Sequence, residues 1–460
     1  HSSHRRQRQM CIRDSHDTGE NEMKNFGFDF SGEIAQLSSG PVGIAIGYEH
    51  RKEEGGFEPD AFIAAGLSSG NAASPVKGEF EVDEAYLELA IPLADGLDLS
   101  ASLRYSDYSS FGETTNAKYG LTYSPNEIVT FRATFAEGFR APSIADLYSG
   151  NNDSYPDIQD PCDVNAANFT GNTDGTQTGQ CLEDGVPTGF TQPNSQIRVT
   201  LGGNPNVQPE ESEGLNLGVI IEPLEGLKLY ADYYEIEITD TISTIGSQLI
   251  MNGCYRENNQ VYCGLIDRLS TGFVDDLRNT TNNIGIVETS GFELAATYDW
   301  SDNLGNWRAT SEIAFLDTYD VTKADGSIEH YAGYVTGNGR NQFKEIKGNF
   351  GLIWNRDVLT LSLSGQYHGK VDGVAGQVPR TATDGSYLIG DDIRSLGDTW
   401  YWDAQANYIF ENINSTLTVG IDNIFDEDPP FFPESFANDF DPSYRTWGSQ
   451  FWYVRVASQF

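Results

Sequence analysis

The feature that most constrains this chain is a two-residue alternation of side chains, seen most clearly in its last stretch, 448–460. Successive side chains of a strand point to opposite faces, so the stretch predicts a strand with one largely apolar face and one mixed face. A soluble domain avoids such a flat uncovered edge, whereas a membrane β-barrel sets one face against lipid. We therefore expect a transmembrane strand whose apolar face is the membrane-insertion signal, made of Trp452, Val454, Val456 and Phe460.

The same alternation recurs from residue 25 onward, hairpin after hairpin. No run approaches the roughly 20 apolar residues of a membrane helix, and the mean hydropathy is −0.43. The pattern predicts about fifteen strands, most near the ~10 residues that span a bilayer when tilted. The predicted strands are 25–37, 41–52, 78–91, 97–109, 116–123, 128–137, 212–222, 227–238, 286–299, 306–319, 341–354, 357–369, 400–411, 415–424 and 448–460.

The connections between these strands alternate between short turns and long polar segments. The turn at 222–226 is short, for example, whereas 138–211 and 239–285 are long. Outer-membrane barrels have this asymmetry, with short periplasmic turns at one rim and long extracellular loops at the other. We predict an all-β, antiparallel transmembrane β-barrel over 25–460. Its odd strand count indicates an incomplete barrel, because single-chain bacterial barrels have even numbers.

The first 24 residues differ from everything that follows. They are rich in Arg and His and have no apolar period. We interpret 1–24 as a non-native or disordered leader, and we expect the native amino-terminal part of the protein to lie upstream of it.

The formal net charge of −40 excludes nucleic acid as a partner, because no basic surface is available for phosphates. Two interpretations of the charge stay open. The acids are solvated loops and lumen, or they form a funnel for a cation or a cationic ligand.

The cysteines predict an oxidising compartment. Two pairs each lie within one polar loop and are disulfide candidates, Cys162 with Cys181 and Cys254 with Cys263. Neither pair has the spacing of a zinc site, so we predict no metal site there. A calcium site remains an alternative for the carboxylates near Cys162, although their spacing does not match an EF-hand loop. These carboxylates are Asp153, Asp157, Asp160 and Asp163.

Four segments together resemble the TonB-dependent outer-membrane receptors. Their order along the chain, with hairpin spacing between them, matches the order in that family. Residues 135–148 resemble its EGFRAPS segment, 203–212 its GNPNLxPExS segment, 288–293 a GxE strand start, and 420–426 its VxNLFD segment. Ser458 departs from the aromatic residue usual at the third position from the end.

The resemblance implies a barrel of about 22 strands, of which this chain holds the carboxyl-terminal portion without the plug domain. It implies ligand-gated active uptake of a scarce small nutrient across the bacterial outer membrane. A ferric siderophore, haem, cobalamin or a carbohydrate would each fit. The implied partners are the TonB–ExbB–ExbD complex acting through the plug, the barrel assembly machinery, and outer-membrane lipid with lipopolysaccharide. No cofactor is expected.

Candidate ligand-binding residues lie in the loops and the lumen. We expect Glu137 and Arg140 to point into the lumen, with Arg140 at the start of the longest loop. An alternative is that Arg140 pairs with a carboxylate such as Glu210 and only fixes the loop base. The full set of candidates is Glu137, Arg140, Tyr148, Tyr155, Glu210 and Tyr255.

Two other classes of function were weighed. A passive, porin-like channel shares the alternation, but it leaves the four motifs without an explanation. An enzyme is not expected, because no Ser–His–acid arrangement, metal site or nucleotide motif is found at local spacing.

Overall fold

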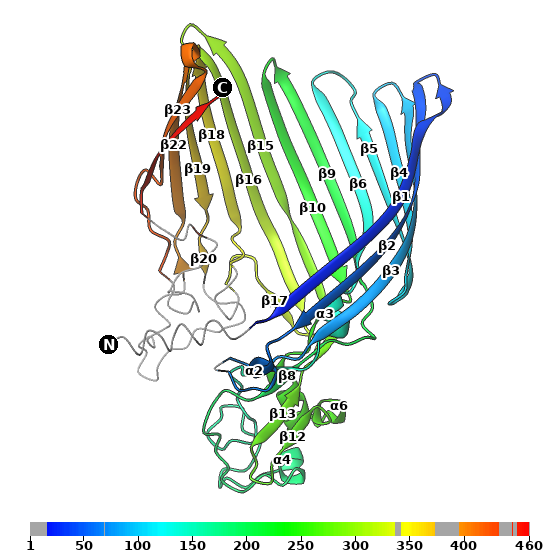
Figure 1. The fold of residues 1–460 in the computed structure, drawn as a ribbon, viewed down its shortest axis with the longest axis vertical. Helices are drawn as coiled ribbons and strands as arrows, with labels where there is room; N and C mark the ends of the chain where they lie inside the picture. The colour runs from blue at the N-terminus through cyan, green and yellow to red at the C-terminus, as the bar shows by residue number, and fades with distance from the viewer. Residues whose placement is uncertain are drawn as a thin grey trace.

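One antiparallel sheet dominates the structure (Figure 1). The computed structural model describes residues 16–68, 70–335, 342–372, 395–431, 444 and 449–459. Fifteen strands of the sheet follow one another in sequence order, and β17 (Ile328–His330) pairs beside β16. The fifteen are β1 (Thr18–Leu37), β2 (Gly40–Glu58), β3 (Val76–Ala94), β4 (Leu97–Tyr108), β5 (Gly112–Tyr123), β6 (Val129–Arg140), β9 (Glu210–Leu224), β10 (Leu227–Thr239), β15 (Ile286–Asp302), β16 (Gly305–Thr322), β18 (Ile346–Arg356), β19 (Leu359–His368), β22 (Thr399–Phe410), β23 (Ser415–Asp422) and β24 (Phe451–Ser458). The all-β, antiparallel prediction is confirmed.

Short turns gather at one end of the sheet and long connections at the other, as the sequence predicted (Figure 1). Near the short turns lies the 3₁₀ helix η1 (Glu411–Ile413), while the long-connection end carries α2 (Ala61–Ala64) and the small pair β20 (Val371–Asp372) and β21 (Ser395–Leu396). Among the described residues, no helix is long and apolar enough to cross a membrane.

The first strand begins earlier than the sequence indicated. β1 starts at Thr18 rather than at residue 25, and it stays paired with β2 as far as Glu58. Residues 18–24 contain a single large apolar side chain, Met23, so no apolar alternation could be recognised there. Of the expected leader, residues 1–15 lie outside the described residues.

Cross-strand register separates an apolar face from a polar face. Phe131 lies opposite Val219, and Phe135 opposite Leu215, while the intervening Arg132 lies opposite Gly218. Because alternate residues share a face, the aromatic and aliphatic rows fall on one side of the sheet and the charged residues on the other. A sheet with this division presents its apolar side to lipid and its polar side to a wet interior.

The last strand carries the predicted insertion signal. Trp452, Val454 and Val456 lie on one face of β24, opposite Ile421, Val419 and Leu417 of β23, and each of the three is more than 60% exposed. Phe460 lies outside the described residues. Within those residues β24 pairs with β23 alone and β1 with β2 alone, so the sheet has two open edges.

Aromatic rings cross the apolar face close to the short turns. Trp300 stacks on Trp307 of the next strand with centroids 5.7 Å apart, Trp354 continues the row on β18, and Tyr298 stacks on Trp300 from the same strand. Aromatic side chains favour the boundary between lipid and water, so this row indicates the membrane interface at that end.

Carboxylates form a second row near the opposite end of the same face. Glu137, Glu213, Glu237, Glu288 and Asp320 are direct cross-strand neighbours on β6, β9, β10, β15 and β16. We call this set the acidic row. On β6 it lies two residues beyond Phe135 on the same face, on the side of the long connections.

A bidentate ion pair spans three strands on the polar face. Arg132 of β6 donates from Nε and Nη2 to the two oxygens of Asp232 on β10, at 2.8 and 2.6 Å. The pair passes over Gly218 of β9. A Cβ at that position would lie 2.0 Å from Asp232 Oδ1 and 2.6 Å from Arg132 Nε. Gly218 therefore leaves the room that the pair needs.

Replacing this glycine should destabilise the protein. We expect Gly218→Ala in the full-length protein to break the Arg132–Asp232 pair and lower the free energy of unfolding by about 1.5–3 kcal/mol, the range for hydrogen bonds to charged groups. The heat-unfolding midpoint in detergent measures this. Gly32→Ala is the matched control, since a Cβ there has nothing within 4 Å. Equal midpoints for the two variants would contradict the assignment.

Candidate functional site

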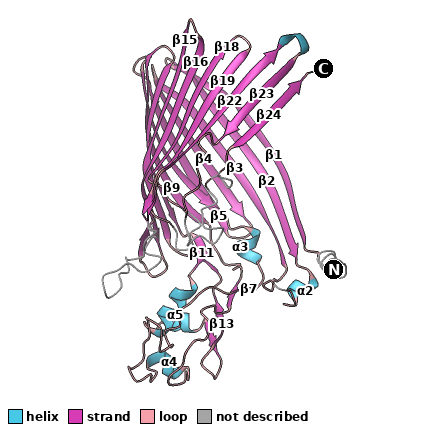
Figure 2. Ribbon diagram, turned by 90° about the vertical axis from the view of Figure 1, so that its left-hand side faces the viewer, coloured by secondary structure: helices cyan, strands magenta, loops and turns pink. Residues whose placement is uncertain are grey.

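The two longest connections, 141–209 and 240–285, fold together at one end of the sheet (Figure 2). We call this body the cap. Its central sheet has the order β12–β13–β8–β7 and draws strands from both connections, with β8 and β13 parallel. The strands of the cap are β7 (Asn152–Ser154), β8 (Val199–Leu201), β11 (Ile242–Thr244), β12 (Ile266–Arg268), β13 (Val274–Arg278) and β14 (Thr281–Asn283), and its helices are α3 (Ile144–Tyr148), α4 (Gly179–Glu183), α5 (Ser247–Tyr255) and α6 (Gln260–Cys263).

The cap has its own apolar core, with residues from both connections. Its buried members are Ile158, Cys162, Cys181, Val186, Phe190, Ile197, Val199, Ile250, Met251, Cys254, Tyr255 and Leu277. Both predicted disulfides are present, Cys162–Cys181 and Cys254–Cys263. A small core gains stability from such crosslinks, which restrict the unfolded chain. The cap is therefore a disulfide-crosslinked domain rather than a pair of independent loops.

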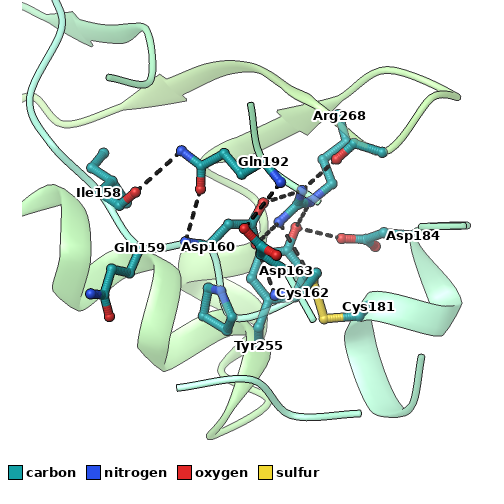
Figure 3. Close-up of polar contacts among 12 residues, drawn as sticks. Ile158, Gln159, Asp160, Cys162, Asp163, Cys181, Asp184, Gln192, Tyr255 and Arg268 are labelled. Carbon is teal, nitrogen blue, oxygen red and sulfur yellow. Dashed lines mark hydrogen bonds and ion pairs between the residues drawn. A yellow bond between two sulfur atoms is a disulfide. The ribbon is translucent and has the colours of Figure 1, made fainter. Parts of the chain in front are cut away.

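A buried ion pair joins the two connections inside the cap (Figure 3). Arg268 donates from both terminal nitrogens to Asp160 at 2.7 Å, and the two side chains are only 3% and 1% exposed. The Nε of Arg268 also donates to the Tyr255 hydroxyl at 2.7 Å, and that hydroxyl donates to Asp184 at 2.8 Å. Burial raises the pKa of Tyr255; burial alone lowers the pKa of Arg268, but its bonds to Asp160 raise it above the ordinary value.

This network changes the expected role of one candidate residue. Tyr255 was expected to contact ligand from a loop, but its side chain is 5% exposed and its ring lies under the Arg268 guanidinium, 4.5 Å from ring centroid to Cζ. It contributes to the core of the cap instead. Tyr155, in contrast, is 42% exposed and remains available at the surface.

The carboxylates considered for calcium do not converge on one point. Asp153 pairs with Arg198, and Asp160 with Arg268. Asp157 accepts from the Ser195 hydroxyl, while Asp163 accepts from the backbone of residues 165 and 192. Across the described ranges no group of three or more such side chains is placed to hold a metal ion.

Breaking the buried pair should loosen the cap. Asp160→Asn leaves Arg268 charged and buried, a loss that typically costs about 3–5 kcal/mol. We expect faster proteolysis within 141–285 of the full-length protein in its membrane. The matched control is Asp157→Asn, which alters an exposed hydrogen bond to Ser195. Indistinguishable digestion of the two variants would exclude this role for Asp160.

A second ion pair attaches the cap to the sheet. Arg140, the last residue of β6, donates from Nε and Nη2 to Glu210, the first residue of β9, at 2.7 and 2.9 Å. Asp146 lies 3.4 Å from the third nitrogen of Arg140, and Glu210 also accepts from the backbone N–H of Ile242 at 2.7 Å. Glu210 thus holds both connections where they leave the sheet. The alternative that Arg140 pairs with Glu210 at the loop base is confirmed.

The short helix α3 places Tyr148 against the sheet. Ser143 and Asp146 form a capping box that fixes the helix start. The Tyr148 ring then covers Gly78 of β3, where a Cβ would lie 2.0 Å from Cδ2. Tyr148 is half-buried by this contact, so it docks α3 on β3.

Glu137 lies apart from Arg140. The two residues are three apart on one strand, so they point to opposite faces and do not share the lumen as expected. Glu137 belongs to the acidic row and accepts from the backbone N–H of Ala117 at 3.0 Å, where β5 separates from β6. A notch of about 350 Å³ opens there, lined also by Asn116 and Glu211.

The hydrogen bonds that Glu210 accepts from Arg140 and from the Ile242 backbone, which we call the Glu210 clamp, yield a local prediction. Glu210→Ala removes the acceptor of the Ile242 amide and both bonds to Arg140, so amide hydrogen exchange at residues 240–244 should accelerate roughly tenfold or more. Exchange followed by mass spectrometry measures this. Glu211→Ala is the control, since no ion pair or side-chain hydrogen bond to Glu211 is found within the described part of the chain. Unchanged exchange in Glu210→Ala would show that the clamp does not hold the cap.

Sequence reasoning did not find Arg268, Asp160 as its partner, or the joint core of the cap. The two cysteine pairs were a signal that both loops are structured. The pairing of the loops was not visible, because Asp160 and Arg268 are 108 residues apart.

The fold defines a class of protein. It is a curled antiparallel membrane sheet that carries a structured cap at the end with the long connections. The sequence profile described as "TonB dependent receptor-like, beta-barrel" matches residues 6–424. The chain belongs to this family, which confirms the predicted barrel. The family is one of transporters and receptors, not of enzymes. No curated protein sequence gives a significant match.

Solved structures show the same fold. A variant of the ferric enterobactin receptor of Pseudomonas aeruginosa, in complex with enterobactin, superposes with a TM-score of 0.62 at 15% identity, covering 96% of this chain and 55% of that one. The siderophore receptor PirA from Acinetobacter baumannii gives a TM-score of 0.60 at 15% identity, with the same coverage. The chain thus spans about half the length of these receptors.

Proposed function

We propose that the full-length protein is a TonB-coupled receptor that captures a scarce nutrient at its cap and moves it across the bacterial outer membrane. The single observation that carries this proposal is the family match over residues 6–424. The cap is a suitable capture surface, because it is a disulfide-crosslinked domain fixed to the rim of the sheet by Arg140 and Glu210.

A ferric siderophore is the nutrient class that we favour over haem, cobalamin or a carbohydrate. The similar solved structures are named as ferric enterobactin and siderophore receptors. Tyr155 on the exposed cap surface is the candidate contact that we retain. Tyr148, Glu137 and the Arg140–Glu210 pair would affect ligand binding indirectly, by fixing the structure at the long-connection end of the sheet.

The proposed partners follow from the family. A plug domain would sit against the polar face and connect to the TonB–ExbB–ExbD complex. The apolar face would meet outer-membrane lipid and lipopolysaccharide, and the barrel assembly machinery would read the Trp452–Val454–Val456 row of β24 together with Phe460.

Energy coupling gives the decisive test. We expect the full-length protein, expressed in receptor-deficient cells, to support uptake of at least one radio-iron siderophore complex, and deletion of TonB to reduce that uptake to background. A vector-only strain is the control.

A porin-like channel would behave differently. It would pass small solutes equally well with and without TonB, and it would not discriminate among siderophores. TonB-independent flux through the full-length protein would overturn the proposal.

A further inference from the structure

The wall of the sheet divides between β5 and β6. The two strands pair over 118–123 of β5 and 131–136 of β6. Beyond these pairs no pairing between them is found, although both strands are described throughout and continue to Gly112 and Arg140. Each strand keeps its other neighbour along this stretch, β5 with β4 and β6 with β9. Two sheet edges therefore face each other across an opening in the wall, which we call the fork.

The geometry of β5 shows which of its backbone groups point into the fork. Ala117 donates its backbone N–H to the Glu137 carboxylate across the fork, at 3.0 Å. In an antiparallel sheet the N–H and C=O of one residue point to the same neighbouring strand, and alternate residues repeat that direction. Thr115 therefore presents both of its backbone groups to the fork, where β6 no longer pairs with them.

The facing edge on β6 is defined in the same way. Ile128, directly before β6, accepts from the N–H of Glu222 on β9, so even-numbered residues face β9 and the odd-numbered Phe139 faces the fork. The Phe139 ring packs against Tyr108 and Phe111 of the β4–β5 hairpin, with centroids 5.8 and 6.3 Å apart. These contacts fix the two edges relative to each other, so the fork is part of the folded structure.

The notch of about 350 Å³ at Glu137 lies in this fork. Two of its lining residues carry buried side-chain oxygens, Thr114 Oγ1 and Asn116 Oδ1, for which no hydrogen-bond partner is found in the described part of the chain. Buried polar atoms are normally paired. The notch thus offers hydrogen-bond acceptors from side chains as well as donors and acceptors from the two backbone edges.

The residues that line the notch determine the sign of its charge. They include five carboxylates and no lysine, arginine or histidine; the carboxylates are Glu113, Glu137, Glu211, Glu213 and Glu237. Charge alone would attract any cation. The open edges add a second requirement, because only an extended backbone supplies donors and acceptors at the spacing of a sheet.

We propose that the fork between β5 and β6 is the docking site for an extended strand of a partner protein, with lysine or arginine on alternate residues. The backbone of the strand pairs with Thr115 and Phe139, by addition to an open sheet edge. Its basic side chains meet the carboxylates of the notch. The acidic row lies on the same outward face, at the end with the long connections, so a protein held at the cell surface can reach the site. This interaction is separate from the proposed uptake function.

Two peptides that differ only in their backbone test strand addition. One alternates lysine and valine, and the other has the same sequence with N-methyl groups along its backbone, so it keeps the charge and loses the donors. Each is labelled and titrated into the full-length protein in outer-membrane vesicles. We expect the unmethylated peptide to bind roughly tenfold or more tightly, because the methylated one cannot donate to the edges. A peptide of alternating glutamate and valine should bind more weakly than the lysine peptide.

A proline at position 115 removes the backbone donor from the fork. Thr115 faces away from β4, so Thr115→Pro leaves the hydrogen bonds between β4 and β5 in place. We expect Thr115→Pro to weaken binding of the unmethylated lysine peptide about tenfold or more. The matched control Thr115→Val changes the side chain but keeps the N–H, and it should weaken binding far less.

Amide hydrogen exchange locates the bound strand. The unmethylated lysine peptide should slow exchange in 113–117 and at Phe139 of the full-length protein. Equal binding of the two lysine peptides, binding of neither, or binding without slower exchange in these segments would overturn the proposal. Equal binding to Thr115→Pro and Thr115→Val would also reject it. The peptide comparison uses the unaltered protein, so it decides the question even where Thr115→Pro does not fold.

Discussion

The cross-strand hydrogen-bond ladder is the constraint on which the rest of this structure depends. In lipid no water can satisfy a backbone N–H or C=O group, so each strand must find its partners in its neighbours. Within the described residues the fifteen strands meet this requirement in sequence order, without a crossover, except along the outer edges of β1 and β24 and in the fork between β5 and β6. Register then decides which side chains share a face. It puts Phe131 and Val219 together on one side, and Arg132 with Asp232 on the other.

The same register determines how the cap is held. β6 and β9 are adjacent, so Arg140 at the end of one strand meets Glu210 at the start of the other, although 70 residues separate them. The connection between them can then grow into a domain without disturbing the sheet. Ile242 joins the same carboxylate, because β10 lies next to β9. Glu210 thereby anchors both long connections to the sheet.

Period-two patterning predicted the strands, the turn asymmetry and the barrel, because these features depend on near neighbours in sequence. Both disulfides were also predictable, since each joins cysteines of one loop. The polar start of β1 was not, because residues 18–24 carry no apolar row. Nor was the burial of Tyr255, which depends on Arg268 and Asp184 arriving from elsewhere. Loop–loop packing leaves no periodic trace, so the candidate contacts at the cap were the weakest part of the sequence prediction.

The acidic row has a consequence for how the protein sits in its membrane. Five carboxylates side by side on the lipid-facing surface repel one another and cannot be drawn into hydrocarbon. The stacked tryptophans Trp300 and Trp307 mark the membrane boundary near the other end of the strands, and the acidic row marks the boundary at its own end. These two boundaries limit how far the barrel can shift along the membrane normal. The register of the strands therefore determines its depth in the bilayer.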